Sequence, residues 1–309
     1  MYYPLSSIFF SVIFLLSGCS QYNEVKPRLL APYTAHVLKQ QLTQFQPKSI
    51  SLQGEIEFSE LLGQLESARS IFVGEIHNRY DHHLLQLKLL TTLHKKNPNI
   101  AIGIEWFQQP YQWVLNRYLN GTLSEAQLLE KSEYKRRWHY NYALLRPILQ
   151  YAEQHTIPVI ALNAPTELTR KIAKSGLASL EPQERCQLAD VIHPASHTYH
   201  KKLSSVFRQH SQNKKLLENF IMVQRVWDET MAMNIAKFLH QYPEHKMLVF
   251  AGQGHMSDGA GIPTDLARQL PHKSVIIAAG ERSERIKEID YFVITEALQL
   301  TKTVSQPQK

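Results

Sequence analysis

Residues 70–77, Ser-Ile-Phe-Val-Gly-Glu-Ile-His, decide the fold, because an unbroken apolar run passes directly into ionisable side chains. A short apolar run without polar alternation is typical of a strand that is buried on both faces of a parallel sheet. Later runs of the same character cover residues 100–104, 157–162, 247–251, 275–279 and 291–294. Helical patterns lie between several of these runs. We therefore predict an α/β fold, with a mostly parallel central sheet flanked by helices.

The ends of four predicted strands carry polar side chains. Glu75 and His77 follow the first run, Glu105 the second and Asn163 the third, while His255 follows the run at 247–251. In an open parallel sheet, ligands bind beyond the carboxyl ends of the strands. We therefore expect these side chains to meet in one crevice.

Three interpretations of this strand-end cluster remain open. Two carboxylates and two imidazoles suit a divalent metal. They also suit general acid–base chemistry, with the pKa of one Glu raised by its neighbour. The third interpretation is a polar cluster that is hydrogen-bonded internally. The sequence contains no Gly-x-Ser-x-Gly or His-Glu-x-x-His motif, which disfavours the hydrolases that those motifs identify.

A second concentration of polar residues is the tract His-Pro-Ala-Ser-His-Thr-Tyr-His at residues 193–200, which holds three of the chain's 15 histidines. Imidazole nitrogen and tyrosinate oxygen are both ligands of haem iron. A solvated helix start, with these residues present by chance, explains the tract equally well. The tract lies in an interval without a convincing strand, from about residue 165 to about residue 245, which predicts a helical insertion.

The N-terminus indicates a secreted lipoprotein. Residues 5–16 form an apolar block that is too short to span a bilayer, followed by a Leu-Ser-Gly-Cys sequence that ends at Cys19. This ending resembles the bacterial lipobox, in which the cysteine is lipidated, with palmitate among the acyl chains. Ser20 favours the outer membrane. The alternative is a buried N-terminal helix in which the cysteine is incidental.

These features divide the chain into a signal peptide (1–18), a tether (19–48), an α/β domain (49–300) and a flexible tail (301–309). Of its 309 residues, 43% are hydrophobic and 20% charged, which indicates a folded chain. The net charge of +7 favours anionic partners, but the longest basic run has only three residues, so we expect no nucleic acid. Two cysteines are too few for a disulfide scaffold.

Four sequence blocks together resemble the ChaN-like haem-binding lipoproteins: Val73–His77, Gly103–Phe107, Arg225–Ala232 and Ala251–His255. The resemblance extends over roughly residues 50 to 300, and the lipobox agrees with it. It implies an α/β haem-binding domain with an added helical portion and a role in haem or iron acquisition at the outer membrane. It also implies haem held through a tyrosine with a histidine nearby, in a homodimer whose haems face each other.

Carried onto this sequence, the resemblance assigns the haem iron to Tyr199, with His197 or His200 as the assisting residue. The leading hypothesis is a haem-binding outer-membrane lipoprotein, attached through lipid on Cys19, that captures or relays haem without catalysis. Its expected partners are haem, the membrane, a second copy of the chain and an outer-membrane haem receptor.

The same family is similar to a wider superfamily that contains erythromycin esterases and Tiki/TraB-type peptidases, which share a Gly-x-x-His motif. Residues 74–77 fit this motif. The resemblance then implies a catalytic set, namely Glu75, His77, Glu105, Arg225 and His255. The alternative hypothesis is therefore a metal-dependent hydrolase of the esterase or peptidase type. A third is a structural lipoprotein that supports an envelope complex.

Overall fold

The computed structural model describes residues 28–30, 35–209, 211, 213–256, 260–281, 289–296 and 298–300. The predicted signal peptide, the lipidation site Cys19 and the predicted tail at 301–309 lie outside the described residues. None of the described helices is long and apolar enough to cross a bilayer.

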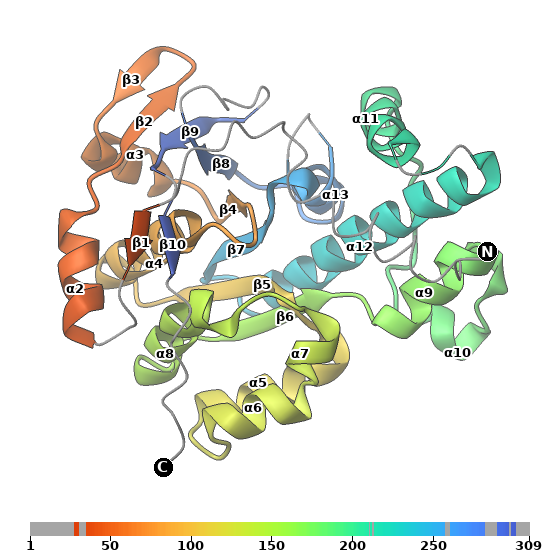
Figure 1. The fold of residues 1–309 in the computed structure, drawn as a ribbon, viewed down its shortest axis with the longest axis horizontal. Coiled ribbons are helices and arrows are strands. Elements are labelled where there is room, and N and C mark those ends of the chain that lie inside the picture. The colour runs from red at the N-terminus through yellow and green to blue at the C-terminus, as the bar shows by residue number, and fades with distance from the viewer. Residues whose placement is uncertain are drawn as a thin grey trace.

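An eight-stranded sheet forms the centre of the described structure, and it is parallel except where β2 meets β3 and β9 (Figure 1). Across the sheet the strands are β3 (Gly54–Ile56), β2 (Lys48–Ser51), β9 (Tyr291–Ile294), β8 (Ser274–Gly280), β4 (Ser70–Glu75), β7 (Lys246–Gly252), β5 (Ile100–Gln108) and β6 (Val159–Asn163). Separately, β1 (Arg28–Leu30) pairs in parallel with β10 (Leu298–Leu300). The predicted α/β fold with a mostly parallel sheet is confirmed.

The six predicted apolar runs form strands β4, β5, β6, β7, β8 and β9, which are neighbours in the sheet. They are apolar because other elements cover both faces of the sheet. Every residue of β4 and β5 is buried. The short strands β2 and β3 were not predicted, because they contain Ser, Lys, Gly and Glu and form the antiparallel edge of the sheet.

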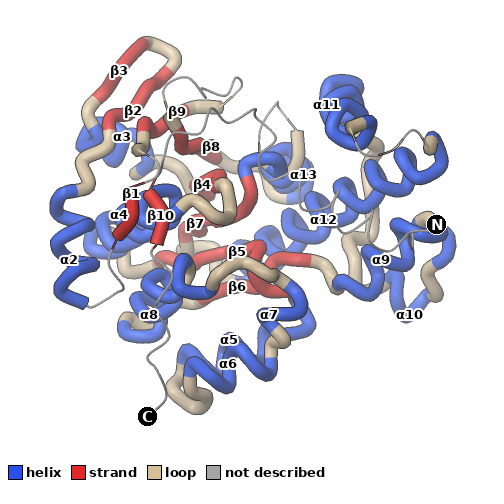
Figure 2. Tube along the Cα trace, in the orientation of Figure 1, coloured by secondary structure: helices blue, strands red, loops and turns tan. Residues whose placement is uncertain are grey.

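Helices fill the connections and cover both faces of the sheet, as the colouring by secondary structure in Figure 2 shows. They are α2 (Ala35–Gln44), α3 (Phe58–Leu65), α4 (Tyr80–Lys96), α5 (Gln112–Leu119), α6 (Glu125–Lys131), α7 (Tyr134–Arg137), α8 (Arg146–Gln154), α9 (Thr166–Ser175), α10 (Pro182–Arg185), α11 (His197–Arg208), α12 (Lys214–Gln241) and α13 (Ile262–Gln269). Helix α2 lies within the range predicted to be a tether, and its Leu38 and Leu42 pack against the largest apolar cluster.

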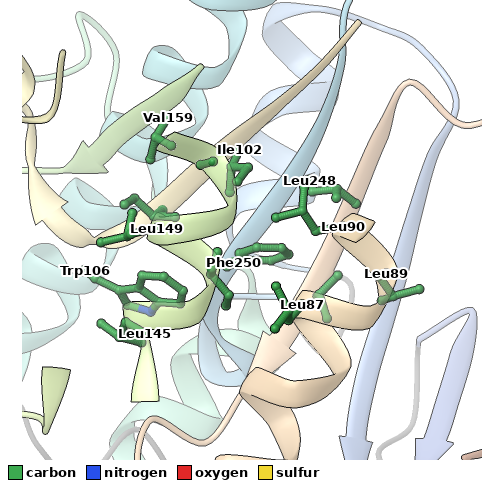
Figure 3. Packing of buried hydrophobic residues seen from close by; sticks show 14 of the residues in the cluster. Leu87, Leu89, Leu90, Ile102, Trp106, Leu145, Leu149, Val159, Leu248 and Phe250 are labelled. Atoms are coloured by element: carbon green, nitrogen blue, oxygen red, sulfur yellow. The ribbon is translucent and has the colours of Figure 1, made fainter. Parts of the chain in front are cut away.

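Alternating strand residues supply two apolar cores, one on each face of the sheet. On one face, Phe250 of β7 and Trp106 of β5 pack with leucines of α4 and α8 (Figure 3). On the other face, Val249 of β7 packs with Met231 and Ile235 of α12 and with residues of α13. Both cores hold the central strands in place, which fixes the positions of the strand ends.

The order of the strands brings the ends of β4, β7 and β5 side by side. From β4 the chain crosses to β5 and β6, passes through α9 to α12, and returns as β7 between β4 and β5. The interval predicted to be a helical insertion thus holds α9, α10, α11 and α12, with no strand among its described residues. Figure 1 shows α12 running from the sheet out to α9 and α11. The order of the strands reverses beside β4. A reversal of strand order is a switch point, at which α/β proteins bind ligands.

Candidate functional site

Glu75 and His77 form a buried pair at the end of β4. Nδ1 of His77 lies 2.8 Å from Oε1 of Glu75, and neither side chain is more than 8% exposed. The same carboxylate accepts hydrogen bonds from Nε1 of Trp106 at 2.8 Å and from Nε2 of Gln86 at 2.5 Å. Because an ionised carboxylate only accepts hydrogen bonds, Nδ1 of His77 carries its proton and Nε2 is left as a base in the neutral ring.

The electrostatic surroundings keep Glu75 ionised. Burial acts to raise its pKa, but the nearby ring of His83 and the hydrogen bonds from His77 and Gln86 outweigh burial and lower the pKa to about 2. In contrast, burial lowers the pKa of the neighbouring His82 to about 4, so this ring is neutral near neutral pH. Its Nδ1 accepts a hydrogen bond from the backbone N–H of Ile76 at 3.0 Å, which holds the turn that follows β4.

His77 is enclosed by aromatic rings and by the backbone of β7. Its ring centroid lies 4.7 Å from that of Trp138 and 4.8 Å from that of Tyr140. Gly252 allows the approach of β7, because a Cβ atom at that position would lie 3.0 Å from Cε1 and 3.1 Å from Nε2 of His77. This part of the site therefore requires glycine at residue 252.

The variant Gly252→Ala is expected to displace the His77 ring, because the new contacts would be shorter than a normal van der Waals separation. We expect a loss of about 1–3 kcal/mol in the free energy of unfolding and a change in the imidazole NMR signals of His77. Gly63→Ala in α3 is the matched control, since no atom lies within 4 Å of a Cβ there. Unchanged His77 signals in Gly252→Ala would contradict the proposed packing.

A chain of polar contacts links the end of β5 to the helical insertion. Oε2 of Glu105 accepts from the backbone N–H of Gly252 at 2.7 Å, and Oε1 lies 3.6 Å from Nε2 of His255. Nδ1 of His255 lies 2.6 Å from Oδ1 of Asp228, whose Oδ2 accepts from the hydroxyl of Tyr199 at 2.9 Å. Burial acts to lower the pKa of His255, but Glu105 and Asp228 outweigh it and raise that pKa. The two regions that the sequence treated as separate candidate sites are therefore in contact.

Arg225 is the central cation of this network. Its Nη2 donates to Glu229 and to Asp265 at 2.8 Å each, and its Nη1 donates to Asp228 at 3.2 Å. The side chain is 4% exposed and each carboxylate is 2% exposed or less. Burial, together with Asp228 and Glu229, raises the pKa of Asp265 to about 7 despite Arg225. The guanidinium thus compensates a concentration of buried negative charge.

The structure brings together all the residues predicted for the strand-end cluster. Nδ2 of Asn163 donates to the backbone carbonyl of Glu105 at 3.1 Å, which places β6 beside the others. Arg225 and His255 join them through Asp228. However, no group of three or more His, Cys, Asp or Glu side chains within the described residues is arranged to hold a metal ion. The arrangement is that of paired acids and bases, with proton transfer to or from His77 as its accessible chemistry.

The predicted haem ligands lie at the start of α11. Tyr199 is 1% exposed and points inward to Asp228, and burial together with that carboxylate raises the pKa of its phenol well above the ordinary value. His197 is exposed, and His200 is partly exposed with its Nδ1 3.3 Å from the Ser204 hydroxyl. In this arrangement the Tyr199 oxygen does not fit a haem ligand, because haem cannot reach it and ionisation is disfavoured. Ligation by Tyr199 would require α11 to move.

Four residues of the site were not predicted from the sequence, namely Asp228, Glu229, Asp265 and Gln86. Arg225, Asp228 and Glu229 stand at i, i+3 and i+4 on one helix, a spacing that predicts ion pairs. This spacing could have indicated the ion pairs, although it does not show whether they are buried or lie on a solvent-exposed face of the helix. Nothing local in the sequence indicated that Asp265 of α13 would join them.

Comparisons with known proteins agree with this architecture. A family model described as haem-binding uptake, Tiki superfamily, ChaN, matches residues 61–266. Among solved structures, the chain is similar to one that shows cofacial haem binding to ChaN of Campylobacter jejuni, with 18% identity, a TM-score of 0.63, and coverage of 86% of this chain and 99% of that one. This likeness supports the fold.

Two further similarities are weaker. An erythromycin esterase mutant in its open conformation is 17% identical with a TM-score of 0.45, over 78% of this chain and 79% of that one. The protein RETICULATA-RELATED 5, chloroplastic, of Arabidopsis thaliana is 23% identical over an alignment of 235 residues, and the match covers 69% of this chain and 31% of that protein. The match thus spans about a third of the plant protein's length.

Proposed function

Because the chain belongs to the haem-binding uptake family of the Tiki superfamily, the ChaN family, we propose that it binds haem as an outer-membrane lipoprotein and takes part in haem or iron uptake or relay. The main support for the proposal is the family match over residues 61–266, which includes strands β4 to β7 and the helical insertion. In this proposal haem is cargo that the protein captures and passes on.

The cellular part of the proposal rests on the sequence. The apolar block at residues 5–16 and the lipobox ending at Cys19 support export and lipid attachment, and Ser20 supports the outer membrane. A membrane-anchored haem carrier needs a donor or acceptor, so we also propose an outer-membrane haem receptor as a partner. The family resemblance supports a second copy of the chain as a further partner. The net charge of +7 suits the two propionates of haem.

A haem titration of the full chain in mild detergent tests the function. We expect a saturable shift of the Soret band, because a protein ligand on the iron changes the visible spectrum of haem. Iron-free protoporphyrin is the matched control, and we expect it to bind more weakly because it lacks the iron–protein bond. If the Soret band of ferric haem shows no saturable change, the proposed function is wrong.

A further inference from the structure

A cluster of three aromatic side chains lies where α4 and α8 end. His94 stands in the last turn of α4, Tyr151 in α8, and His155 directly after the last residue of α8. Both helices end a few residues before a strand begins, α4 before β5 and α8 before β6. The cluster therefore lies beside the amino ends of these strands, whereas Glu75 and His77 lie at the carboxyl end of β4.

Tyr151 contacts both imidazole rings and holds them close together. Its hydroxyl lies 3.2 Å from Nδ1 of His94, and the two rings are perpendicular, at an interplanar angle of 90°. The ring of His155, one helical turn further along, lies against the ring of Tyr151 with 4.2 Å between their centroids. Because Tyr151 packs against the largest apolar cluster, it gives both histidines a fixed support.

The spacing of the two imidazoles suits one metal ion between them. Their ring centroids are 5.4 Å apart, at an interplanar angle of 63°. Two imidazoles that bind the same ion through bonds of about 2.0–2.1 Å have centroids about 4.5–5 Å apart. His155 is exposed and His94 is partly exposed, so ions in solution reach both rings. A small rotation of the exposed His155 side chain closes the remaining gap without movement of either helix.

Each imidazole has a nitrogen available for a metal. Among the described residues, no group forms a hydrogen bond with Nε2 of His94 or with either ring nitrogen of His155. When Nδ1 of His94 carries the ring proton, it donates to the Tyr151 oxygen and leaves the lone pair of Nε2 free. Histidines that bind metals commonly donate their other ring N–H to an oxygen, which orients the ring. Tyr151 thus acts as a positioning residue and not as a ligand.

The local charge also favours a cation. The C-terminal end of a helix carries partial negative charge, because its last carbonyl groups lack partners within the helix. Two such ends lie together here, since the rings of His94 and His155 are in contact. Nζ of the neighbouring Lys96 lies 2.6 Å from Oε1 of Glu66, so the charge of this lysine is compensated. Lys95 is exposed, and solvent screens its charge.

We propose that His94 and His155 bind one divalent transition-metal ion, with Tyr151 positioning the imidazole of His94. Imidazole nitrogens suit Cu²⁺, Ni²⁺ and Zn²⁺, and Cu²⁺ generally binds most tightly of the three. Two protein ligands leave the remaining coordination positions to water. The site is separate from the proposed haem binding, and it requires no third histidine, cysteine or carboxylate.

The test is a Cu²⁺ titration of the haem-free full chain, without an added histidine tag, in mild detergent at about pH 7.5, where imidazoles are mostly neutral. A competing chelator of known affinity measures the dissociation constant of the tightest site. His94→Ala and His155→Ala should each raise this constant about tenfold or more. His240→Ala, which removes an exposed histidine from the last turn of α12, is the matched control and should not change it. Thermal unfolding without metal shows whether each variant keeps its fold.

Two further measurements separate ligation from a structural role. The double variant His94→Ala/His155→Ala should bind Cu²⁺ hardly more weakly than either single variant, because the shared site is already lost. Electron paramagnetic resonance of the wild-type complex should show two imidazole nitrogens on the copper, and that of either single variant should not. Tyr151→Phe keeps the ring that packs against His155 and loses the hydroxyl, so it should weaken binding about tenfold and keep the two-nitrogen signal.

Three outcomes would overturn the inference. If neither ligand variant weakens binding more than His240→Ala does, the cluster is an aromatic contact that holds no metal. If the replacement of His193, His197 and His200 together by alanine removes the tightest site, the ion binds in the tract at residues 193–200. If the losses of the two single variants add fully in the double variant, the two histidines do not share one ion.

Discussion

Arg225→Met is expected to lower the free energy of unfolding by about 3–5 kcal/mol, because it would leave three buried carboxylates without their shared cation. The side chains of Asp228, Glu229 and Asp265 are each 2% exposed or less, and all three accept hydrogen bonds from the guanidinium. Methionine fills a similar volume, so the loss of free energy of unfolding measures the removal of the positive charge more than the creation of a cavity. Urea denaturation followed by circular dichroism measures it.

Arg146→Met is the matched control for that measurement. Nε of Arg146 lies 2.8 Å from a Glu125 oxygen, as close as the contacts of Arg225, but the two side chains are 44% and 29% exposed. Exposed pairs contribute less than about 1 kcal/mol, because solvent screens both charges. Equal losses in the two variants would show that the carboxylates around Arg225 find other partners or become protonated at little cost.

The sheet and the strand-end cluster could be predicted because both follow from local sequence and a general rule of topology. A short apolar run such as the one before Glu75 is typical of a strand that is buried on both faces of a sheet. The carboxyl ends of neighbouring parallel strands lie at one edge, so Glu75, His77 and Glu105 had to be neighbours once the fold was known. This inference required no knowledge of side-chain partners.

The inward orientation of Tyr199 could not be predicted, because it depends on where α11 begins. The Ser196 hydroxyl accepts a hydrogen bond from the backbone N–H of Tyr199 at 3.2 Å and caps the helix. This start places Tyr199 in one buried stripe with Leu203 and Phe207 at intervals of four residues. His193 stays outside the helix, where contacts with a helix more than 30 residues further along the chain fix its ring. Such distant contacts leave no local pattern in a single sequence.

Glu75→Gln is expected to reduce stability at neutral pH and to remove a pH dependence that the wild-type chain shows in acid. The pKa of Glu75 is lowered from the ordinary 4.5 to about 2 in the folded state, because His83, His77 and Gln86 outweigh the effect of its burial. A lowered folded-state pKa means that ionised Glu75 stabilises the fold above the unfolded-state pKa. This contribution is lost as the pH falls from about 4.5 towards about 2.

The pKa difference of about 2.5 units corresponds to roughly 3 kcal/mol, so wild type should be more stable than Glu75→Gln by about that amount near neutral pH. Urea denaturation at a series of pH values from about 6 to about 3 measures the difference, which should narrow steadily below about pH 4.5. Glu57→Gln, which removes an exposed carboxylate with no capping hydrogen bond, should follow the wild-type curve. A gap between wild type and Glu75→Gln that stays constant across this range would mean that Glu75 acts only through its shape and hydrogen bonds. In that case its charge does not hold His77 in the orientation that leaves Nε2 as a base.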